Sequence, residues 1–434
     1  MARIILNTFG SLGDLHPFLA VAMGLRQRGH DAVIATSEVY RQKVVAEGVG
    51  FAPVRPDVGL MMDDADFVAK LWHPTRGSEF LLRDYLVPQV KDGYEDLAAA
   101  CRGADLLLTH SVGLAGPIVS EKLNLPWLSV ALQPLVFFSV YDPPIVPGAE
   151  FLKHLYRFGP GVFRAFKKLA RFRLDPWAEP IQKLRAQLGL PRSQGNPLLD
   201  YFSPTGTLAL FSEAFVQPQP DWPPNTVMTG FVYYDQLGQV PGAWQDDPSE
   251  IEEFLQTGPP PVLFTLGSSA VMHPGEFFRE SIAAVCALGV RAVLLAGRGW
   301  TEIHNPLPDS IWVGSYLPFS KIMPRSAAIV HQGGIGTTAQ ALRAGRPMLV
   351  TPWSHDQPDN AARIQRLGIG RTIKRNHYYA PRVADELKTL LTQPSYAERA
   401  NEASEEILLE DGITAACDAI EQAIREEKLS FLPD

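Results

Sequence analysis

The chain has 434 residues, of which 46% are hydrophobic and 20% are charged, and its formal net charge is −8. This length exceeds what one hydrophobic core usually serves and predicts two domains, while the apolar content predicts that the whole chain folds. The acidic balance excludes a general polyanion binder, because nucleic-acid affinity depends on clustered Lys and Arg, so we expect no nucleic-acid partner.

The cysteines and the apolar segments indicate the compartment. Cys101, Cys286 and Cys417 are far apart and have neither disulfide nor metal spacing, which fits a reducing environment. The first residues contain too short an apolar run for a signal peptide, and no window reaches the roughly 20 apolar residues of a membrane-spanning helix. We therefore expect a cytoplasmic protein.

The first half of the chain alternates short Val, Ile and Leu runs with amphipathic stretches. This βαβα order predicts a parallel sheet with helices on both faces. The expected strands are Ile4–Phe9, Ala32–Thr36, Ala104–His110, Trp127–Leu132, Thr207–Phe211 and Thr226–Gly230. The expected helices are Pro17–Arg28, Glu38–Glu47 and Ala115–Leu123.

The second half repeats this order after a Gly- and Pro-rich stretch, Asp235–Pro261, which contains one expected helix, Ser249–Gln256. The expected strands are Val262–Leu266, Ala292–Ala296, Trp312–Tyr316, Ala327–His331 and Met348–Thr351, and the expected helices are Pro274–Leu288 and Thr337–Ala344. The sequence thus predicts two doubly wound α/β domains, 1–235 and 236–434, which face a central cleft. The helical tail Arg382–Lys428 is expected to close the second domain.

The most informative motif is HQGGIGTT, which follows the expected strand Ala327–His331. Its glycines allow close backbone approach to a ligand, and a helix that opens at Thr337 presents amides and a positive dipole end to an anion. His331 adds a donor, and a positive charge if it is protonated beside phosphate. The motif lacks the glycine order of a dinucleotide fold and the Lys of a P-loop, so NAD and ATP sites are disfavoured. A plain strand-to-helix turn remains the alternative.

The run HQGGIGTTAQALRAGRPMLVTPWSHDQPDNAARIQRLGIG, residues 331–370, resembles the donor-binding signature of the UDP-glucosyl/glucuronosyl transferase family. That family includes plant, sterol, macrolide and glycopeptide glycosyltransferases. The resemblance extends to VGSYLPFSKIMPRSAAIV, FTLGSS and LLAGRGW and to the N-terminus, and leaves the middle of the first half unmatched. It implies two Rossmann-like domains of the GT-B type.

The resemblance also implies a set of donor-binding residues. His331 and the amides around Gly334, Gly336 and Thr337 would contact the diphosphate, with Ser268 on its other side. Asp356 and Gln357 would bind the hydroxyls of the sugar, and Tyr316 and Leu317 would hold the nucleotide base. A core aromatic at the end of a strand is the alternative for Tyr316. The remaining donor-site residues that we assign on this basis are Gly13, Arg298, Gly333 and Trp353.

An inverting transfer needs one base that takes the proton of the acceptor hydroxyl. The loop GSLGDLHP, residues 10–17, resembles the loop of the family in which the residue after the second glycine is the catalytic base; here that residue is Asp14. His16 is the competitor, since histidine titrates nearer neutral pH. The alternatives are a helix N-cap for Asp14 and a packed histidine for His16.

Relatives with a histidine base carry a supporting aspartate at the end of a later strand, and here that strand ends with His110. If Asp14 and His110 meet, the usual pair is present with its members exchanged, and His110 could itself be the base. A strand-end histidine with only a structural hydrogen bond is the alternative.

The acceptor pocket is expected near PLVFFSVYDPP, residues 134–144, with Phe137, Phe138 and Tyr141 as its lining, and core packing of these aromatics is the alternative. Asp64 and Asp66 match the Asp-x-Asp metal motif of another glycosyltransferase architecture, but we expect a solvated turn there. No His or Cys cluster has metal spacing, so the sequence predicts no cofactor and activity in EDTA.

Residues 151–174 contain seven Lys or Arg and no acidic residue. In the stretch 161–173, Val162, Phe163, Phe166, Leu169 and Ala170 have helical spacing. Such a basic amphipathic helix either packs its apolar face over a cleft or contacts an anionic membrane.

These features predict an inverting, metal-independent transfer of a hexose, from UDP-glucose first and a dTDP-sugar second, to a hydroxyl of a small apolar acceptor. A sterol, polyketide, flavonoid or lipid would fit. A non-catalytic partner protein, which would be expected to lose these site residues, and a dinucleotide-dependent oxidoreductase are the rival classes.

Overall fold

The computed structural model describes residues 1–57, 59, 64–151, 154, 158–235, 248–268, 270–297 and 307–430. The chain divides into two compact units. The first comprises residues 1–10, 14–234 and 410–434, and the second comprises residues 11–13 and 235–409.

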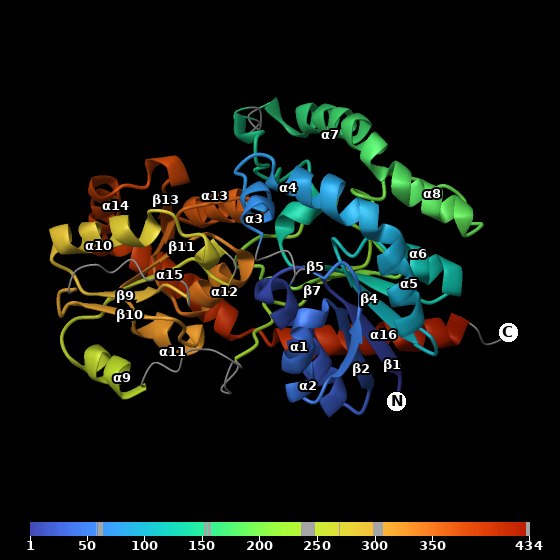
Figure 1. Cartoon of the computed structure of the whole chain (residues 1–434), viewed down its shortest axis with the longest axis horizontal. Helices are drawn as coiled ribbons and strands as arrows, with labels where there is room; N and C mark the ends of the chain where they lie inside the picture. The colour runs from blue at the N-terminus through green and yellow to red at the C-terminus, as the bar shows by residue number, and fades with distance from the viewer. Residues whose placement is uncertain are drawn as a thin grey trace. The chain divides into compact units, whose positions relative to one another are not determined.

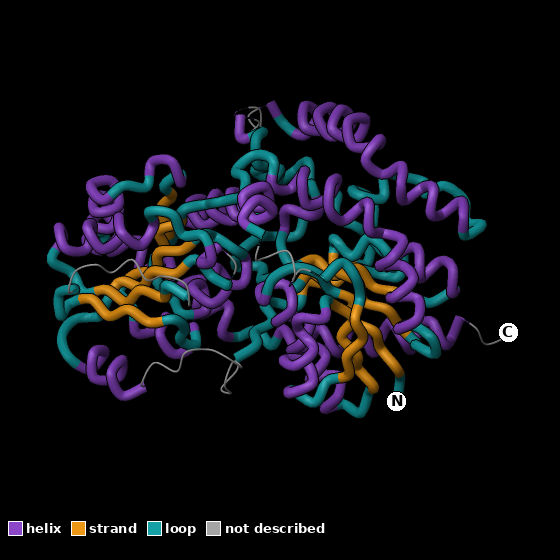
Figure 2. The backbone as a smooth tube through the Cα atoms, in the orientation of Figure 1, coloured by secondary structure: helices purple, strands orange, loops and turns teal. Residues whose placement is uncertain are grey.

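The first unit is built on a parallel sheet of seven strands in the order β3-β2-β1-β4-β5-β6-β7. Its strands are β1 (Arg3–Asn7), β2 (Asp31–Thr36), β3 (Gly50–Pro53), β4 (Leu106–His110), β5 (Trp127–Ala131), β6 (Thr207–Ala209) and β7 (Thr226–Met228). Figure 2 shows helices on both faces of this sheet.

The helices of the first unit include one long C-terminal member. They are α1 (Leu12–Gln27), α2 (Arg41–Ala46), α3 (Ala65–Leu71), α4 (Gly77–Glu79), α5 (Val90–Ala100), α6 (Gly116–Leu123), α7 (Pro160–Leu174), α8 (Glu179–Gln187) and α16 (Gly412–Ser430). A π-helix, η3 (Phe80–Leu86), and the 3-10 turns η1 (Glu38–Tyr40), η4 (Val87–Gln89), η5 (Pro134–Phe137) and η7 (Asp175–Ala178) complete the set.

The second unit is built on a parallel sheet of six strands in the order β10-β9-β8-β11-β12-β13. Its strands are β8 (Val262–Thr265), β9 (Ala292–Leu295), β10 (Ile311–Gly314), β11 (Ala328–His331), β12 (Met348–Val350) and β13 (Gly370–Thr372). Its helices are α9 (Pro248–Gln256), α10 (Phe277–Leu288), α11 (Phe319–Ile322), α12 (Ile335–Arg343), α13 (Gln357–Leu367), α14 (Ala380–Thr392) and α15 (Pro394–Leu408), and its 3-10 turns are η8 (Ala270–Met272), η9 (Met323–Arg325) and η10 (Arg375–His377).

The central strands of both sheets are fully buried. In the first unit Ile5, Val33 and Leu107 of three neighbouring strands pack with Leu97 of α5 and Val119 of α6. Continuous apolar runs suit strands that are covered on both faces, which explains why the sequence pattern identified them. The doubly wound α/β class is therefore confirmed.

The C-terminal helix differs from its expected place. We expected the terminal helices to close the second domain, but α16 packs against α1 of the first unit (Figure 1). A Cβ atom on Gly24 would lie 2.7 Å from Ile413 Cγ2, and the Arg28 guanidinium is 2.5 Å from the Asp418 carboxylate. Periodicity shows that α16 is a helix but not which surface it covers.

Two local expectations also change. Asp64 and Asp66 are exposed to solvent, as expected, but they lie at the start of a helix and not in a turn, since the Asp64 carboxylate accepts hydrogen bonds from the N–H groups of Asp66 and Phe67 and caps α3. Helix α1 begins at Leu12, whereas we expected it near Pro17, which lies inside the helix. None of the helices in the described part of the chain combines the length and apolar character that a membrane crossing requires.

Candidate active site

The first unit brings Asp14 and His110 together at the carboxyl ends of β1 and β4. Asp14 lies in the first turn of α1, and His110 is the last residue of β4. His110 Nε2 is 3.8 Å from Asp14 Oδ1, longer than a hydrogen bond but within reach of one after a small adjustment. The two side chains therefore lie side by side, which is the first of the two alternatives that the sequence left open for His110.

The protonation of His110 follows from its neighbours. Its Nδ1 accepts a hydrogen bond from the N–H of Val112 at 3.4 Å, which places the proton of a neutral ring on Nε2, facing Asp14. Burial lowers the pKa of His110, and the Asp14 charge opposes this effect. The His110 side chain is 3% exposed and that of Asp14 is 28% exposed, so Asp14 is the member that a substrate can reach.

Gly10 makes room for the Asp14 carboxylate. It has a φ of +130°, and a Cβ atom at this position would lie 2.2 Å from Asp14 Oδ2. The loop is also fixed at its carbonyl, because the Tyr40 hydroxyl donates to Gly10 O at 2.8 Å. Asp14 is two residues inside α1, so it does not serve as the N-cap.

His16 is poorly suited to act as the base. Its ring packs 4.7 Å from the ring of Tyr234, and its Nε2 is buried without a hydrogen-bond partner among the described residues. Burial, together with the Lys43 charge, lowers the pKa of His16 to about 3. The buried Nε2 of His16 is shielded from an acceptor hydroxyl, whereas the Asp14 carboxylate is partly exposed.

The second unit places His331 at the end of β11, where it is fully buried. Its Nδ1 accepts a hydrogen bond from the N–H of Gly333 at 3.1 Å, so a neutral ring carries its proton on Nε2. That Nε2 has no hydrogen-bond partner among the described residues. Burial lowers the pKa of His331 to about 3, which makes it a neutral donor in this structure and not the cation that the motif allowed.

The glycines after His331 shape a turn into α12. Gly333 has a φ of +89°, and a Cβ atom there would lie 2.8 Å from Val350 Cγ1. Gly334 precedes the helix, which begins at Ile335, two residues before the expected Thr337. The amides of Ile335, Gly336 and Thr337 therefore belong to the first turn, where N–H groups have no partner within the helix and attract an anion.

Gln332 is a residue that the sequence analysis missed. Its Nε2 lies 2.3 Å from where a Cβ atom on Gly267 would be and 3.0 Å from one on Gly334, so it lies between two glycine turns. Its Oε1 is buried and has no hydrogen-bond partner among the described residues. The position of Gln332 between His331 and Gly333, in the middle of the motif, was the feature of the sequence that could have marked it as a site residue. Ser268, next to Gly267, is exposed.

Asp356 and Gln357 are held by a local network at the start of α13. Gln357 Oε1 accepts hydrogen bonds from the N–H groups of Trp353 at 2.8 Å and Ser354 at 3.2 Å. Asp356 Oδ2 accepts one from Asn360 at 2.6 Å, and the same Asn360 amide donates to Gly333 O at 2.9 Å. Asn360 thus ties the expected sugar-binding carboxylate to the glycine turn.

The other expected donor-site residues have different environments. Trp353 is buried under the Arg375 guanidinium, which lies 3.5 Å from the ring centroid, and Trp353 Nε1 lacks a partner in the described part of the chain.

Tyr316 follows β10 and is 43% exposed, which is unlike a core aromatic; Leu317 beside it is half-buried. Gly13 lies in α1, where its N–H donates to Ser11 Oγ at 3.2 Å. Arg298 lies outside the described residues.

The three expected acceptor aromatics do not line one pocket. Phe137 is 3% exposed and stacks on Trp222 with ring centroids 4.5 Å apart, which makes it a core residue. Phe138 has a φ of +45°, and its carbonyl accepts a hydrogen bond from Lys167. Tyr141 is 45% exposed, and its hydroxyl accepts a hydrogen bond from Arg164 at 3.1 Å.

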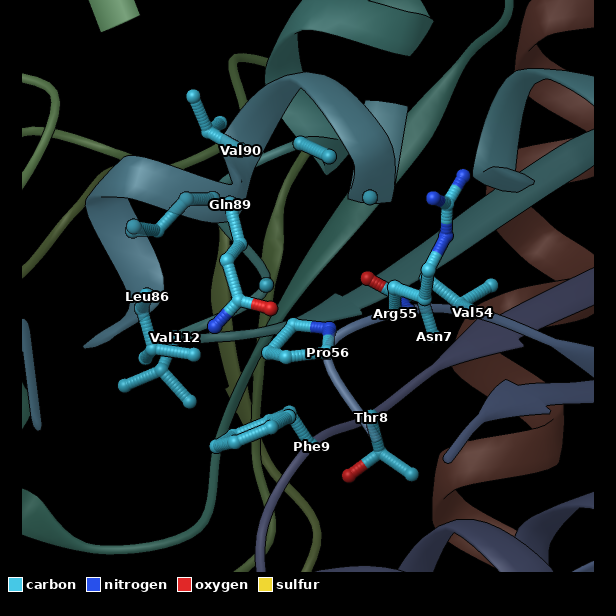
Figure 3. Close-up of a pocket in the computed structure, with 14 residues that line it drawn as sticks. Asn7, Thr8, Phe9, Val54, Arg55, Pro56, Leu86, Gln89, Val90 and Val112 are labelled. Carbon is cyan, nitrogen blue, oxygen red and sulfur yellow. The ribbon is translucent and has the colours of Figure 1, made fainter. Parts of the chain in front are cut away.

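A small cavity lies near the ends of β1 and β4, where Thr8, Val112 and Gly113 line it, but neither Asp14 nor His110 does. Figure 3 shows Phe9, Pro56 and Gln89, from three separate segments, facing it. Its wall includes Thr8, whose hydroxyl donates to Asp14 O at 3.3 Å, and Gly113, whose N–H donates to His110 O at 2.8 Å. Its volume of about 40 Å³ holds a few water molecules and is too small for a whole sterol or macrolide.

Known proteins match nearly the whole chain. Residues 4–132 match the glycosyltransferase family 28 N-terminal domain, and residues 280–419 match the erythromycin biosynthesis protein CIII-like C-terminal domain. The chain is 32% identical to O-mycaminosyltylonolide 6-deoxyallosyltransferase of Streptomyces fradiae, over 97% of both chains. The chain belongs to the UDP-glycosyltransferase family.

A second kind of relative is much longer. The sterol 3-beta-glucosyltransferase of Pichia angusta is 27% identical over 96% of this glycosyltransferase, which spans 33% of that protein. Among solved structures, the calicheamicin glycosyltransferase CalG4 has a TM-score of 0.72 at 18% identity and covers 98% of both chains. The glycosyltransferase VinC in complex with DTDP has a TM-score of 0.68 at 21% identity, over 98% of this chain and 100% of that one.

These findings confirm the GT-B fold and a hexosyltransferase of the natural-product or sterol type. They support a transferase over the two rival classes, the oxidoreductase and the non-catalytic partner. The finer assignments, which are the donor, the acceptor and the roles of individual residues, are taken up below.

Proposed function

We propose that this glycosyltransferase performs an inverting, metal-independent transfer of a hexose from a nucleoside diphosphate donor to a hydroxyl of a small apolar acceptor. The observation that carries this proposal is the pair of Asp14, which a substrate can reach, and the buried His110 behind it. A carboxylate in this setting can accept a proton on one oxygen while the adjacent neutral imidazole N–H orients the other oxygen.

The reaction follows as a single displacement. The acceptor hydroxyl transfers its proton to Asp14 while its oxygen forms a bond to the anomeric carbon of the sugar. The bond from that carbon to the diphosphate oxygen breaks on the opposite face, so the configuration inverts. The His331 Nε2–H and the first amides of α12 would stabilise the negative charge that develops on the leaving diphosphate.

The sugar would be held at the start of α13. Asp356 can accept hydrogen bonds from sugar hydroxyls. Because Gln357 Oε1 is already used by Trp353 and Ser354, Gln357 would contribute its Nε2 as a donor. Tyr316 and Leu317 would hold the nucleotide base of the donor, and Ser268 and Gly13 would complete the donor site.

UDP-glucose is the first donor to test and a dTDP-sugar the second. The sterol relatives, whose name specifies a glucosyltransferase, favour glucose, whereas the Streptomyces fradiae relative and the VinC complex with DTDP favour a dTDP-deoxysugar. The same relatives suggest a sterol or polyketide acceptor. An acceptor dissolved in a membrane would reach the protein from a lipid surface, and residues 151–174 are the segment suited to contact one.

The test is calorimetric titration of the full chain with UDP, dTDP, GDP and NAD in EDTA. We expect UDP or dTDP to bind and the other two to remain silent. Binding of NAD, or of none of the four, would contradict the proposal. Once an acceptor is found, the anomeric configuration of the product, measured by NMR, must be opposite to that of the donor, and activity must persist in EDTA.

A further inference from the structure

Helix α7 carries two apolar faces, only one of which is packed. The inner face, Phe163, Phe166, Ala170 and Leu174, points to the body of the first unit. Phe163 is 4% exposed and packs in a cluster with Val140, Phe166 and Ala149. This face accounts for the attachment of the helix.

The second face is exposed. We define the outer stripe as Val162, Ala165, Leu169 and Phe172, whose spacing of three, four and three residues places them along one side of the helix. Leu169 is 62% exposed and Phe172 is 75% exposed. Phe158, just before the helix, is 59% exposed. The sequence analysis grouped Val162 and Leu169 with Phe163, but the structure separates the two faces.

Basic side chains flank the outer stripe on both sides. A helical turn of 100° per residue places Lys168 at one margin and Arg173 at the other. Both are exposed, and neither forms an ion pair with any residue that the structure describes. The other cations of α7 are engaged elsewhere, because Arg164 contacts Tyr141, Lys167 contacts Phe138 O and Arg171 pairs with Asp200.

The charge of this segment is opposite to that of the chain. Residues 151–174 contain seven Lys or Arg and no acidic residue, although the whole chain has a net charge of −8. An exposed apolar stripe bordered by unpaired cations is complementary to an anionic lipid surface, where apolar side chains enter the headgroup boundary and Lys and Arg remain at the phosphates. Figure 1 shows α7 outside the layers of sheet and helix that form the first unit.

We propose that the outer stripe of α7, with Lys168 and Arg173, docks the protein onto an anionic membrane surface. The helix has 15 residues, so a contact along it would be about 22 Å long. The docking itself stands on the helix alone. Only its purpose, delivery of a lipid-dissolved acceptor, rests on the proposed function.

The test is co-sedimentation of the full chain with vesicles of neutral phosphatidylcholine and with vesicles that also contain about 30% phosphatidylglycerol. We expect binding to the anionic vesicles, weakened by added salt, because exposed charges are screened. Replacing Lys168 and Arg173 by Glu should lower partitioning about 25-fold or more, since each lost charge is worth roughly fivefold. Replacing Leu169 and Phe172 by Ser should have an effect of at least about tenfold.

The matched control is the pair Leu408→Ser and Leu409→Ser, since these leucines are 61% and 90% exposed in the second unit and lie outside α7. This control should partition like the parent. Equal binding to both vesicle types, or an α7 variant that behaves like the parent, would overturn the proposal. A third outcome would also overturn the proposal. It is that the parent does not bind vesicles but forms a concentration-dependent dimer, seen by light scattering, which the Leu169 and Phe172 changes abolish.

Nucleotide titration of the same variants separates this proposal from the proposed function. Variants that lose vesicle binding should still bind UDP or dTDP as the parent does, which also shows that they are folded. If no nucleotide binds to the parent but the vesicle results hold, the proposed function fails and the docking surface stands.

Discussion

The candidate sites of the two units, around Asp14 in the first and His331 in the second, differ in how their polar atoms are hydrogen-bonded. Around β11 and β12 of the second unit, several buried polar atoms have no hydrogen-bond partner among the described residues. They are His331 Nε2, Gln332 Oε1, Thr338 Oγ1, Trp353 Nε1 and Asn360 Oδ1. We take these atoms, which belong to or follow the ends of β11 and β12, as the groups of the second unit that a polar ligand would satisfy.

The candidate site of the first unit has a more exposed reactive group, although His110 Nε2 there also has no hydrogen-bond partner among the described residues. The Asp14 carboxylate is partly exposed and placed over Gly10, and the buried His110 stands behind it. Affinity for the donor should therefore depend on the buried groups of the second unit, whereas turnover should depend on one accessible carboxylate of the first. Variants in each half can separate the two quantities.

The largest effect is expected for Asp14→Asn. The amide keeps the size of the side chain but cannot take a proton, so turnover should fall by roughly 100- to 10,000-fold, the usual range for a general base. The dissociation constant for UDP or dTDP should change little. Steady-state kinetics and calorimetry measure the two quantities.

The matched control for this change is Asp64→Asn. Asp64 caps α3, and asparagine caps helices as well as aspartate does, so this variant should be as active as the parent. A normal rate for Asp14→Asn would remove Asp14 from the mechanism. If His110→Gln lost activity while Asp14→Asn kept it, His110 would instead be the base.

A smaller effect, on binding, is expected for His331→Ala. The change removes one donor to a charged diphosphate, which is worth about 1.5–3 kcal/mol and corresponds to roughly 10- to 150-fold weaker nucleotide binding. Calorimetry should show this loss, and the exposed His377→Ala should show none. If His331→Ala lowered turnover with nucleotide affinity intact, the division between the two candidate sites would be wrong.

Much of this arrangement follows from local sequence. The buried strands are continuous apolar runs, and Asp14, His110 and His331 lie at loops or strand ends that the pattern of strands locates. Packing partners that are far apart in the sequence cannot be predicted in this way. Phe137 stacks on Trp222, 85 positions away, and α16 packs on Gly24 of α1, because partners are selected by three-dimensional packing.

The start of α1 shows a different limit of sequence reasoning. Pro17 is a good first residue of a helix, so the pattern favoured a helix from there. In the structure the helix begins at Leu12 and includes Pro17, which brings Asp14 into its first turn. Likewise, the sequence identified Gln357 but not that its Oε1 is used by Trp353 and Ser354, since hydrogen bonding depends on the folded loop.

The smallest effect, a pH dependence of stability, compares the two units through a buried histidine in each. Burial lowers the pKa of His16 and of His331 to about 3. An unfolded histidine has a pKa of about 6.5, so between these values the unfolded state binds a proton that the folded state does not. Each histidine therefore makes stability fall as the pH falls from about 6.5 towards 3, by about 1.4 kcal/mol per pH unit.

Replacement by Gln removes this titration. We expect the loss of Tm between pH 7 and pH 5 to be smaller in His331→Gln and in His16→Gln than in the parent, whereas the exposed His377→Gln should lose as much as the parent does. Scanning calorimetry at the two pH values measures the difference. Because a bound diphosphate would favour the protonated form of His331 and not that of His16, added UDP or dTDP should reduce the acid sensitivity that depends on His331 alone. Equal protection of both histidines would show that nucleotide acts on the stability of the whole chain and not at the His331 turn.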